Sequence, residues 1–415
     1  MARTSYINKS MSIPLKQFQE ARERLKTIIK PTSLIYSEFL SEEYEADIYI
    51  KPENLQRTGS FKIRGAFNRI AGLSPEQRKH GIVTASAGNH AQGVALAAQF
   101  FYNIDSQCCA RATIVMPETT PLIKVEATKK LGAVVILHGD NYDEAYAEAR
   151  RIEKEYSSVF VHPFNDLEVI IGQGTIGLEI LDECSDADLV FVPVGGGGLL
   201  AGVAAAIKAV TSSVQVIGVE PDGAAGITES QRVGSLVELD SVDTIADGVA
   251  VKASGDLCLE IIQDTVDGMV TAPDTGIMQA LLILMERQKL VAENAGALSV
   301  AGLAHFDVKG KKVVCLVSGG NIDILTLSEM LNRGLVSRGR LFSFAVELLH
   351  KPGELLKIST ILALHNANVV KLDHDQFHNP SRFKSVRLDV TVETNGCAHV
   401  EKLVAALSEA GYKII

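Results

Sequence analysis

The chain has 415 residues, 47% of them hydrophobic and 22% charged, which is typical of a globular protein with room for two or three domains. Its formal net charge of −10, with no dominant basic tract, argues against nucleic acid or an acidic membrane as a partner. No apolar run approaches the roughly 20 residues of a membrane-spanning helix, and the N-terminal stretch lacks the apolar core of a signal peptide. None of the six cysteines has metal-ligand spacing, and the neighbours Cys108 and Cys109 are poorly placed to pair, so we expect reduced thiols in the cytoplasm.

Up to about residue 317 the chain alternates between helical patterns and short apolar runs. Residues 15–29 have the periodicity of a helix, which ends at Pro31. The apolar, β-branched runs predict strands at residues 47–51, 82–85, 113–116, 134–137, 159–161, 189–193, 214–219, 269–271 and 313–317. Because the runs are continuously apolar and most are separated by helices, they predict an α/β fold with a mainly parallel sheet covered on both faces. Ligands of such sheets bind beyond the carboxyl ends of the strands.

After residue 333 the pattern changes. Residues 334–340 combine glycine, serine and arginine and predict a short basic linker. Beyond the linker the expected order is strand 341–349, helix 352–365, strand 367–374, strand 384–393, helix 399–410 and strand 413–415. This βαββαβ order predicts a separate α+β domain, in which both helices lie on one face of an antiparallel sheet.

The most informative stretch is KPENLQRTGSFKIRGA, residues 51–66, which is centred on Lys62. The turn Thr58-Gly59-Ser60 predicts an N-cap, so that Lys62 would lie in the first turn of a helix. The positive helix end, Arg57 and Arg64 would then favour the neutral amine, which is the form that attacks carbonyl groups. The alternative is an ordinary surface lysine after a turn.

Three further polar stretches follow predicted strands. Gly195, Gly196, Gly197 and Gly198 open a helix, and their backbone N–H groups could converge on a phosphate, although a tight strand-to-helix turn also needs glycine. In Ser86-Ala87-Gly88-Asn89-His90, Asn89 can donate to a phenolate oxygen and the loop N–H groups can hold a carboxylate; an N-cap serine with a turn glycine is the alternative.

Ser318 supplies one hydroxyl after the strand at residues 313–317. A hydroxyl facing a pyridine nitrogen cannot stabilise a pyridinium as an aspartate would, which favours β-elimination over transamination. An amine, a polar loop, a phosphate cradle and a hydroxyl are together the groups needed to hold pyridoxal phosphate. The sequence therefore predicts an enzyme with this cofactor.

These stretches resemble the threonine dehydratases (threonine ammonia-lyases) of the fold type II pyridoxal phosphate family. The similarity runs from about residue 13 to residue 333, through KPENLQRTGSFKIRGA, SAGNHAQGVA, MPETTPLIKVEATKKLGA, HPFND, GQGTIGLEI, PVGGGGLLAG, ADGVAVK, ENAGAL and VSGGNID. The resemblance implies that Lys62 forms the Schiff base with the cofactor beside Phe61, and that Asn89 meets the cofactor's 3′ oxygen. It places Gly195 to Gly198 with Leu199 at the phosphate and Ser318 at the pyridine nitrogen. The substrate would contact Ser86, Ala87, Gly88, Asn89 and His90, with Phe164 as a pocket wall or, alternatively, a core side chain.

The resemblance also implies an architecture. Residues 1–333 would form the catalytic domain, built from two parallel-sheet α/β subdomains, of which the smaller, at about residues 58–156, is inserted into the larger. Residues 341–415 resemble an ACT domain, an amino-acid-sensing module, with an effector site at His350, Gly353 and Leu355. Isoleucine is the first candidate effector because threonine deamination begins its synthesis in this family. The exposed edge strand of this module predicts a homodimer or homotetramer.

The reaction implied is the conversion of L-threonine to 2-oxobutyrate and ammonia, with L-serine to pyruvate as a second activity. A serine dehydratase or racemase is the alternative enzyme, and a catalytically inactive amino-acid sensor is the non-enzyme alternative. In the related serine racemases a second serine acts as an acid-base group where this chain has Ala87. Those relatives also bind a divalent ion through a carboxylate near the position of Glu220 and a second carboxylate six residues further on. In this chain Gly226 stands at the second position, so Glu220 and Ala224 are the candidate ligands.

Overall fold

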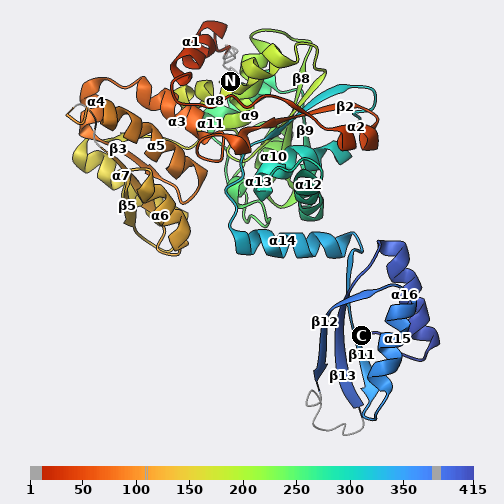
Figure 1. Cartoon of the computed structure of the whole chain (residues 1–415). Coiled ribbons are helices and arrows are strands. Elements are labelled where there is room, and N and C mark those ends of the chain that lie inside the picture. The colour runs from red at the N-terminus through yellow and green to blue at the C-terminus, as the bar shows by residue number, and fades with distance from the viewer. Residues whose placement is uncertain (1–11, 108, 110, 376–384) are drawn as a thin grey trace, which may run out of the picture. The chain divides into compact units, whose positions relative to one another are not determined.

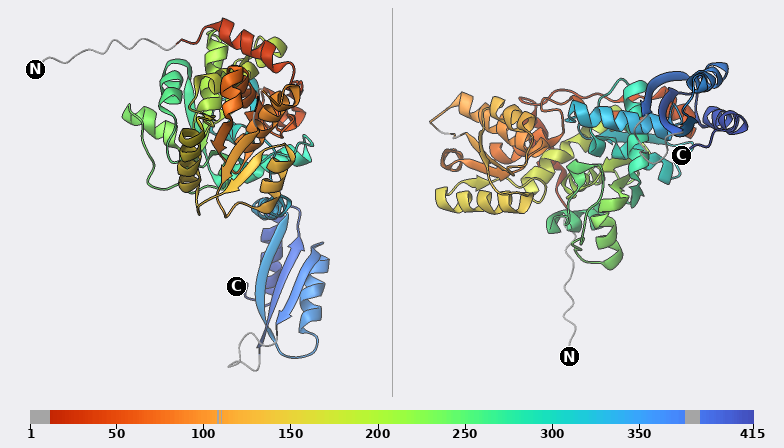
Figure 2. Two further views of the ribbon diagram at one scale, coloured as in Figure 1. Left: turned by 90° about the vertical axis from the view of Figure 1, so that its left-hand side faces the viewer. Right: turned by 90° about the horizontal axis from the view of Figure 1, so that it is seen from below.

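The computed structural model describes residues 12–107, 109, 111–375 and 385–415. The chain divides into two compact units, residues 1–322 and 323–415. In the first unit, two sheets with their helices lie side by side, the smaller drawn in orange to yellow (Figures 1 and 2). Among the described residues, no helix combines the length and the apolar character needed to cross a bilayer.

The larger sheet has six strands in the order β1-β2-β10-β7-β8-β9. Their bounds are β1 Ile35–Tyr36, β2 Asp47–Pro52, β7 Leu189–Pro193, β8 Gln215–Pro221, β9 Gly268–Ala272 and β10 Lys312–Val317. Only β1 runs antiparallel to its neighbour, and the other pairs are parallel. All five residues of β7 are buried, as a strand covered on both faces requires. The prediction of a mainly parallel sheet is confirmed.

The smaller sheet is parallel throughout, in the order β5-β4-β3-β6. Its strands are β3 Ile82–Ala85, β4 Ala112–Met116, β5 Val134–Leu137 and β6 Val159–Phe160. Alternate side chains of β3 and β4 enter two different apolar clusters: Ile82 and Ile114 pack in one, and Val83 and Val115 pack in the other. This period of two is what a sheet with a core on each face produces.

Helices cover both sheets. In the first unit they are α1 Leu15–Leu25, α2 Glu38–Tyr44, α3 Lys62–Ala71, α4 Pro75–His80, α5 Asn89–Ile104, α6 Leu122–Lys130, α7 Tyr142–Tyr156, α8 Leu167–Glu183, α9 Gly198–Lys208, α10 Gly226–Val233, α11 Asp256–Thr265, α12 Asp274–Glu286 and α13 Asn294–Ala301. Short 3-10 turns span Glu53–Leu55, Asp222–Ala224, Asp247–Val249 and Gly302–His305. On the larger sheet, α8, α9 and α11 pack into one cluster with β7 and β8, whereas α13 contacts β7, β8 and β10. On the smaller sheet, α3 and α5 share one cluster and α7 the other.

The second unit contains α14 Ile324–Ser337, β11 Leu341–Leu349, α15 Glu354–Leu364, β12 Asn368–Asp375, β13 Ser385–Glu393 and α16 Cys397–Glu409. Its sheet is antiparallel in the order β11-β13-β12. Apolar residues of α15 and α16 pack against β11 and β13 in one core, so the sheet has both helices on one face, as predicted (Figure 1). The last predicted strand, 413–415, is reduced to a single antiparallel bridge between Val346 and Ile414.

The structure corrects the predicted linker. Residues 334–337 are not a loop but the end of α14, and Gly334 is buried. An apolar stripe of leucines and Met330 gives this segment the helical period, which outweighs the single glycine. The unit boundary also falls earlier than residue 333, between Ile322 and Asp323. Two smaller corrections are that α1 ends at Leu25, four residues before the predicted end, and that β1 was not predicted. Lys384, the predicted first residue of its strand, and Cys108 lie outside the described residues.

Candidate active site

Lys62 is the first residue of α3, and its amine points to a distant part of the chain. Its Nζ donates a hydrogen bond to the carbonyl oxygen of Pro163 at 2.9 Å. The predicted N-cap is wrong: Phe61, in a helical conformation and without a side-chain cap, precedes the helix. Ser60 instead forms an antiparallel bridge with Gly319, and the Phe61 N–H donates to the carbonyl oxygen of Ser318. The lysine segment is therefore held against the end of β10.

Burial lowers the pKa of the Lys62 amine to about 8, although Cys258 and Glu293 oppose this shift. Desolvation disfavours the charged ammonium, which makes the neutral amine accessible near physiological pH. The sequence predicted this direction for different reasons, namely the positive end of the helix and the cations Arg57 and Arg64. Arg57 is exposed and Arg64 is engaged in ion pairs with two carboxylates, so neither explains the shift.

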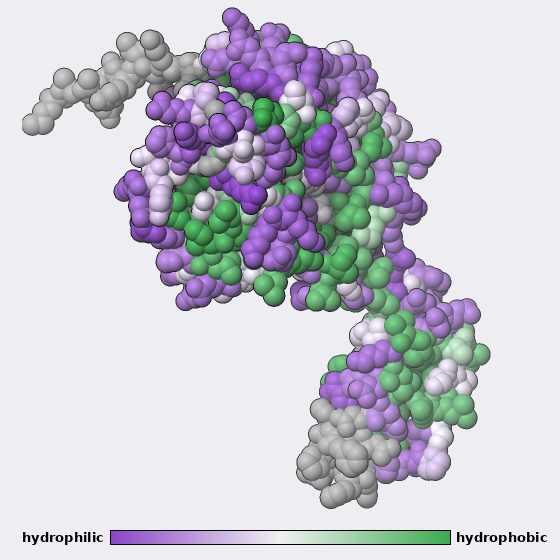
Figure 3. Space-filling model, turned by 60° about the vertical axis from the view of Figure 1, so that its left-hand side comes forward, coloured by the Kyte–Doolittle hydropathy of each residue, from purple (hydrophilic) through white to green (hydrophobic). Residues whose placement is uncertain are grey.

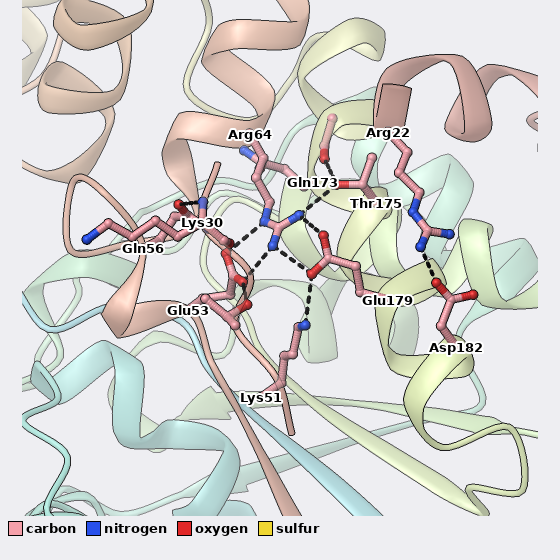
Figure 4. A network of polar contacts seen from close by, with 12 residues as sticks. Arg22, Lys30, Lys51, Glu53, Gln56, Arg64, Gln173, Thr175, Glu179 and Asp182 are labelled. Atoms are coloured by element: carbon pink, nitrogen blue, oxygen red, sulfur yellow. Dashed lines mark hydrogen bonds and ion pairs between the residues drawn. The ribbon is translucent and has the colours of Figure 1, made fainter. Parts of the chain in front are cut away.

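The guanidinium of Arg64 is fully buried and joins three elements (Figure 4). It donates to both carboxylate oxygens of Glu53, each at 2.8 Å, and to both of Glu179, at 2.6 and 2.9 Å. Lys51 Nζ lies 2.8 Å from Glu179, so two cations face two carboxylates. Despite burial, Arg64 and Lys51 hold the pKa of Glu179 below its usual range. Because the group is compensated in charge, it can be buried, and it ties the start of α3 to α8.

The glycine run between β7 and α9 is tightly enclosed. A Cβ on Gly196 would lie 2.4 Å from the Phe164 ring, and one on Gly198 would lie 2.8 Å from the Phe164 carbonyl oxygen. A Cβ on Gly195 would meet the Val249 backbone at 2.9 Å. Gly197 has a φ of 93°, a left-handed conformation that favours glycine. Leu199 is buried in the first turn of α9, where backbone N–H groups have no helical acceptor and suit an anion.

Phe164 connects this loop to the lysine, because it follows Pro163, the acceptor of the Lys62 hydrogen bond. Its ring is half-buried against the core of the larger sheet and stacks edge-on with His162 at 4.7 Å between centroids. The structure therefore places Phe164 over the glycine loop.

The loop after β3 is organised by its first residue. Ser86 Oγ accepts from the backbone N–H groups of Gly88 and Ala91, both at 3.3 Å, and Gly88 is the N-cap of α5. Ala87, between them, is half-buried. His90 is buried, and its Nε2 is paired with the Val161 carbonyl oxygen at 2.9 Å. Burial, reinforced by the nearby Lys62, lowers the pKa of His90 to about 3, so its ring is neutral.

Asn89, the first residue of α5, faces two distant residues. Its Nδ2 donates to Glu293 Oε1 at 2.6 Å, and its Oδ1 accepts from Asn321 Nδ2 at 2.7 Å. Asn321 belongs to the SGGN stretch that also contains Ser318, which is 4% exposed directly after β10. The carboxyl ends of β3, β7 and β10 thus supply Asn89, the glycine loop and Ser318, and the first turn of α3 supplies Lys62.

This set fits pyridoxal phosphate chemically: a half-buried amine of lowered pKa, a glycine cradle that a Cβ would fill, an amide and a hydroxyl. The model of the family described as "Pyridoxal-phosphate dependent enzyme" matches residues 25–319. The chain belongs to the pyridoxal-phosphate-dependent enzymes. Its cofactor is pyridoxal 5′-phosphate.

Relatives of this enzyme resemble it over most of their lengths. The chain is 46% identical over 403 residues to the L-threonine ammonia-lyase of Thermotoga maritima. The matched region covers 97% of this chain and 99% of that relative. It is 44% identical over 329 residues to a catabolic L-threonine dehydratase of Staphylococcus aureus, covering 78% and 93%. Among solved structures, threonine deaminase isoform 2 of Solanum lycopersicum matches with a TM-score of 0.72 and 39% identity, covering 77% and 90%. Maize serine racemase matches with a TM-score of 0.72 and 34% identity, covering 79% and 99%.

Sequence reasoning missed Glu293 and Asn321 as members of the site. Glu293 is 7% exposed, and burial raises the pKa of its carboxyl group to about 7. Both residues lie in stretches quoted for the family, ENAGAL and VSGGNID, but nothing local marks them. An acid directly before a helix reads as an ordinary N-terminal charge.

The enzyme uses Glu220 as a helix cap. Its Oε1 accepts from the Ile227 N–H at 2.8 Å, and its Oε2 accepts from the N–H and hydroxyl of Thr228 at 2.8 and 2.6 Å. Burial raises the pKa of this carboxyl. Ala224 is buried in the adjacent 3-10 turn. Within the described ranges, no group of three or more His, Cys, Asp or Glu side chains is placed to hold a metal ion. In this structure the Glu220 carboxylate caps the start of α10, and the cation site at Glu220 and Ala224 stays a prediction.

The second unit of the enzyme has a groove of about 640 Å³ beside the predicted effector turn. Gly353, with a φ of 94°, is the N-cap of α15, and His350 and Leu355 flank the turn. The groove is lined by Glu347, Leu349, Lys351, Glu354, Leu356, Lys357, Thr360, Ile361, Ala410, Gly411 and Tyr412. Glu354 Oε1 lies 2.9 Å from Lys357 Nζ and 3.4 Å from Lys351 Nζ. The predicted residues His350, Gly353 and Leu355 thus adjoin this groove without lining it.

Proposed function

We propose that this enzyme converts L-threonine to 2-oxobutyrate and ammonia by β-elimination, and L-serine to pyruvate and ammonia. The observation that carries the proposal is the half-buried amine of Lys62 at the start of α3, which has a lowered pKa and donates to Pro163, next to the Phe164 that covers the glycine loop. The substrate is supported by the 46% identity with an L-threonine ammonia-lyase over 97% of the chain. Serine lacks only one methyl group of threonine, and a pocket discriminates such a difference by roughly 10- to 200-fold at most.

When bound, the cofactor withdraws electrons from the substrate's α-carbon, so that its proton can be removed. Lys62 is the base that accepts this proton, since its amine is neutral in a useful fraction of molecules near pH 8. The β-hydroxyl then takes up a proton from the resulting Lys62 ammonium and leaves as water. The enamine that remains reacts with a second water to give the keto acid and ammonia. We propose Lys62 as the single catalytic side chain, held in place by Pro163 and by the Arg64 ion pairs.

The other site residues bind and orient. Gly195, Gly196, Gly197, Gly198 and Leu199 would hold the phosphate, Asn89 the 3′ oxygen and Ser318 the pyridine nitrogen, with Phe61 beside Lys62. Ser86 Oγ accepts hydrogen bonds from the N–H groups of Gly88 and Ala91. The neighbouring N–H groups of Ala87, Asn89 and His90 would then meet the substrate carboxylate, with Phe164 as the wall.

The test is keto-acid production from threonine, together with the visible absorbance of the purified enzyme. Lys62→Ala should reduce turnover by at least about a thousandfold, because it removes both the base and the covalent attachment. Lys16→Ala is the matched control, since that side chain is 82% exposed. Turnover at the wild-type rate in Lys62→Ala would overturn the assignment. If the enzyme shows the cofactor's visible absorbance but forms no keto acid from threonine or serine, the substrate assignment is wrong and the cofactor assignment stands.

We also propose that residues 341–415 are an ACT-type regulatory module of a homodimer or homotetramer. Large apolar side chains are exposed on this unit, including Leu349, Leu356, Leu364 and Val370, and Figure 3 shows hydrophobic patches on its visible face. Such patches are typical of protein interfaces. The effector, with isoleucine as first candidate, would bind at the turn of His350, Gly353 and Leu355. Cys184, Cys258, Cys315 and Cys397 are free thiols, which is consistent with our proposal of a reducing, cytoplasmic environment.

A further inference from the structure

Glu293 is a buried carboxylate at the site, and its side chain is directed at the start of α5. It is the N-cap residue of α13, and its Oε1 accepts from Asn89 Nδ2 at 2.6 Å. Its backbone N–H donates to the Gly319 carbonyl oxygen at 3.0 Å. A Cβ on Gly319 would lie 2.2 Å from Glu293 Oε1. The carboxylate therefore rests on the glycine that follows Ser318, and any side chain there would displace it.

The surrounding hydrogen bonds determine which way the Asn89 amide faces. Asn321 Nδ2 donates to the Thr58 carbonyl oxygen at 2.6 Å and to Asn89 Oδ1 at 2.7 Å. Because a backbone carbonyl can only accept, it directs the Asn321 NH2 group toward itself and toward Asn89. Asn89 must then present its oxygen to Asn321 and its nitrogen to Glu293. An amide nitrogen carries two N–H groups, so the bond to Glu293 orients the second one toward another acceptor.

Glu293 is also placed to change its charge near neutral pH. Burial raises the pKa of its carboxyl to about 7, and Asp247 acts in the same direction. The hydrogen bond from Asn89, the cation Lys124 and the backbone N–H of Asn321 favour the ionised form. The Lys62 amine, whose pKa is about 8, interacts electrostatically with the same carboxylate. The charge of Glu293 can therefore respond to pH near neutrality.

We propose that Glu293 is a positioning residue that holds Asn89 so that its second N–H meets the cofactor's ring oxygen, and that the charge of Glu293 alters the cofactor's absorbance. This inference rests on the pyridoxal phosphate assignment and not on the identity of the amino-acid substrate. An ionised carboxylate close to the ring disfavours negative charge on the ring oxygen, whereas a protonated one does not.

The experiment compares the holoenzyme with the variants E293Q, E293A, N89A and E293A/N89A. Equilibrium dialysis measures the dissociation constant of pyridoxal phosphate. E293A should weaken cofactor binding by about tenfold or more, because the amide loses a charged partner. E293Q retains an acceptor oxygen and should stay within about threefold of the wild type. If Glu293 acts through Asn89, E293A should add nothing to the loss caused by N89A alone.

Absorbance spectra between pH 6 and 8 provide a second measurement, which a purely structural role would not affect. The wild-type spectrum should change across this range, and the E293Q spectrum should not. Additive losses in E293A/N89A, or an unchanged pH response in E293Q, would overturn the proposal. Should E293A fail to fold, the pH response of the isosteric E293Q decides alone. Threonine turnover enters neither measurement, so a wrong substrate assignment cannot be mistaken for a failure here.

Discussion

Lys62 Nζ and the carbonyl oxygen of Pro163 are 2.9 Å apart, although 101 residues of chain separate them. This hydrogen bond links the first turn of α3 to the segment whose next residue, Phe164, covers the glycine loop. The amine and the phosphate cradle are therefore positioned by one short stretch, His162 to Phe164. A displacement of that stretch would move both.

The titration of Lys62 predicts how stability depends on pH. The pKa of Lys62 is about 8 when folded, against 10.5 for an exposed lysine. Below pH 8 both the folded and the unfolded chain carry the proton, and burying the ammonium destabilises the fold. Between pH 8 and 10.5 only the unfolded chain keeps the proton, so this cost is progressively relieved. Relative to Lys62→Met, the unfolding free energy of the cofactor-free protein should rise by up to about 3 kcal/mol over this range. If urea denaturation gives the same change in unfolding free energy between pH 7.5 and 10.5 for both proteins, the prediction is wrong.

The Arg64 ion pairs predict a large loss of stability on truncation. Arg64→Ala leaves Glu53, which is fully buried, and Glu179 without their main cation. We expect the unfolding free energy to fall by about 3–5 kcal/mol, as for other broken buried pairs. Arg22→Ala is the control, because Arg22 pairs with Asp182 at the surface (Figure 4), where the loss should not exceed about 1 kcal/mol. If Arg64→Ala and Arg22→Ala lower the unfolding free energy equally in thermal or urea unfolding, the buried ion pairs do not contribute more to stability than the surface pair.

The contact between Gly196 and Phe164 predicts an effect on cofactor affinity. In Gly196→Ala the new methyl would lie 2.4 Å from the Phe164 ring, so the loop or the ring must move. We expect the dissociation constant of pyridoxal phosphate to increase by about tenfold or more, a cost typical of overpacking. Gly276→Ala is the control, since its nearest atoms would be 3.7 Å away. Adding Phe164→Ala should recover part of the loss; no recovery would show that the clash is not the cause.

Ala87 predicts the stereochemical outcome. The resemblance places Ala87 where serine racemases carry the serine that acts on the far face of the substrate. Because a methyl group has no proton to donate, D-threonine and D-serine should be negligible beside keto acid. Ala87→Ser introduces a hydroxyl at that position and should raise the D-enantiomer to a measurable level. Chiral chromatography of the reaction mixture tests both statements. Substantial D-amino acid from the wild type would mean that another group supplies the proton.

The unit boundary sets where a truncation should test regulation. Because α14 belongs to the second unit, the cut should follow Ile322 and not Arg333, which lies inside that helix. We expect isoleucine, valine or serine to shift the threonine saturation curve of the full chain and to leave that of residues 1–322 unchanged. Threonine must in turn shift the effector's affinity by the same factor. A shift that survives truncation, or none in the full chain, would refute regulation by this unit.

The sequence by itself determined the elements whose signal is local. Four predicted strands, at residues 82–85, 134–137, 189–193 and 341–349, match the observed bounds, because an apolar run between turn residues needs no distant partner to be recognised. The four polar stretches were identified for a related reason, since each follows or adjoins a strand and parallel strands bring their carboxyl ends to one edge. Hydrophobic periods of two and 3.6 residues also predicted the order strand, helix, strand, strand, helix over residues 341–409, but they missed α14 and overstated the last strand.

Only the tertiary structure decided what depends on contacts between distant residues. Glu293 meets Asn89 across 204 residues, and Arg64 meets Glu179 across 115, so no window of sequence contains either relationship. The lowered pKa of Lys62 was predicted from the positive helix end and two neighbouring cations, but burial is its main cause, and burial is a property of the whole packed unit. Serine is favoured at the N-cap position of helices, but the pairing of Ser60 with Gly319 outweighs that local preference. Packing and desolvation are sums over neighbours that the fold assembles, which is why these features could not be read from the sequence.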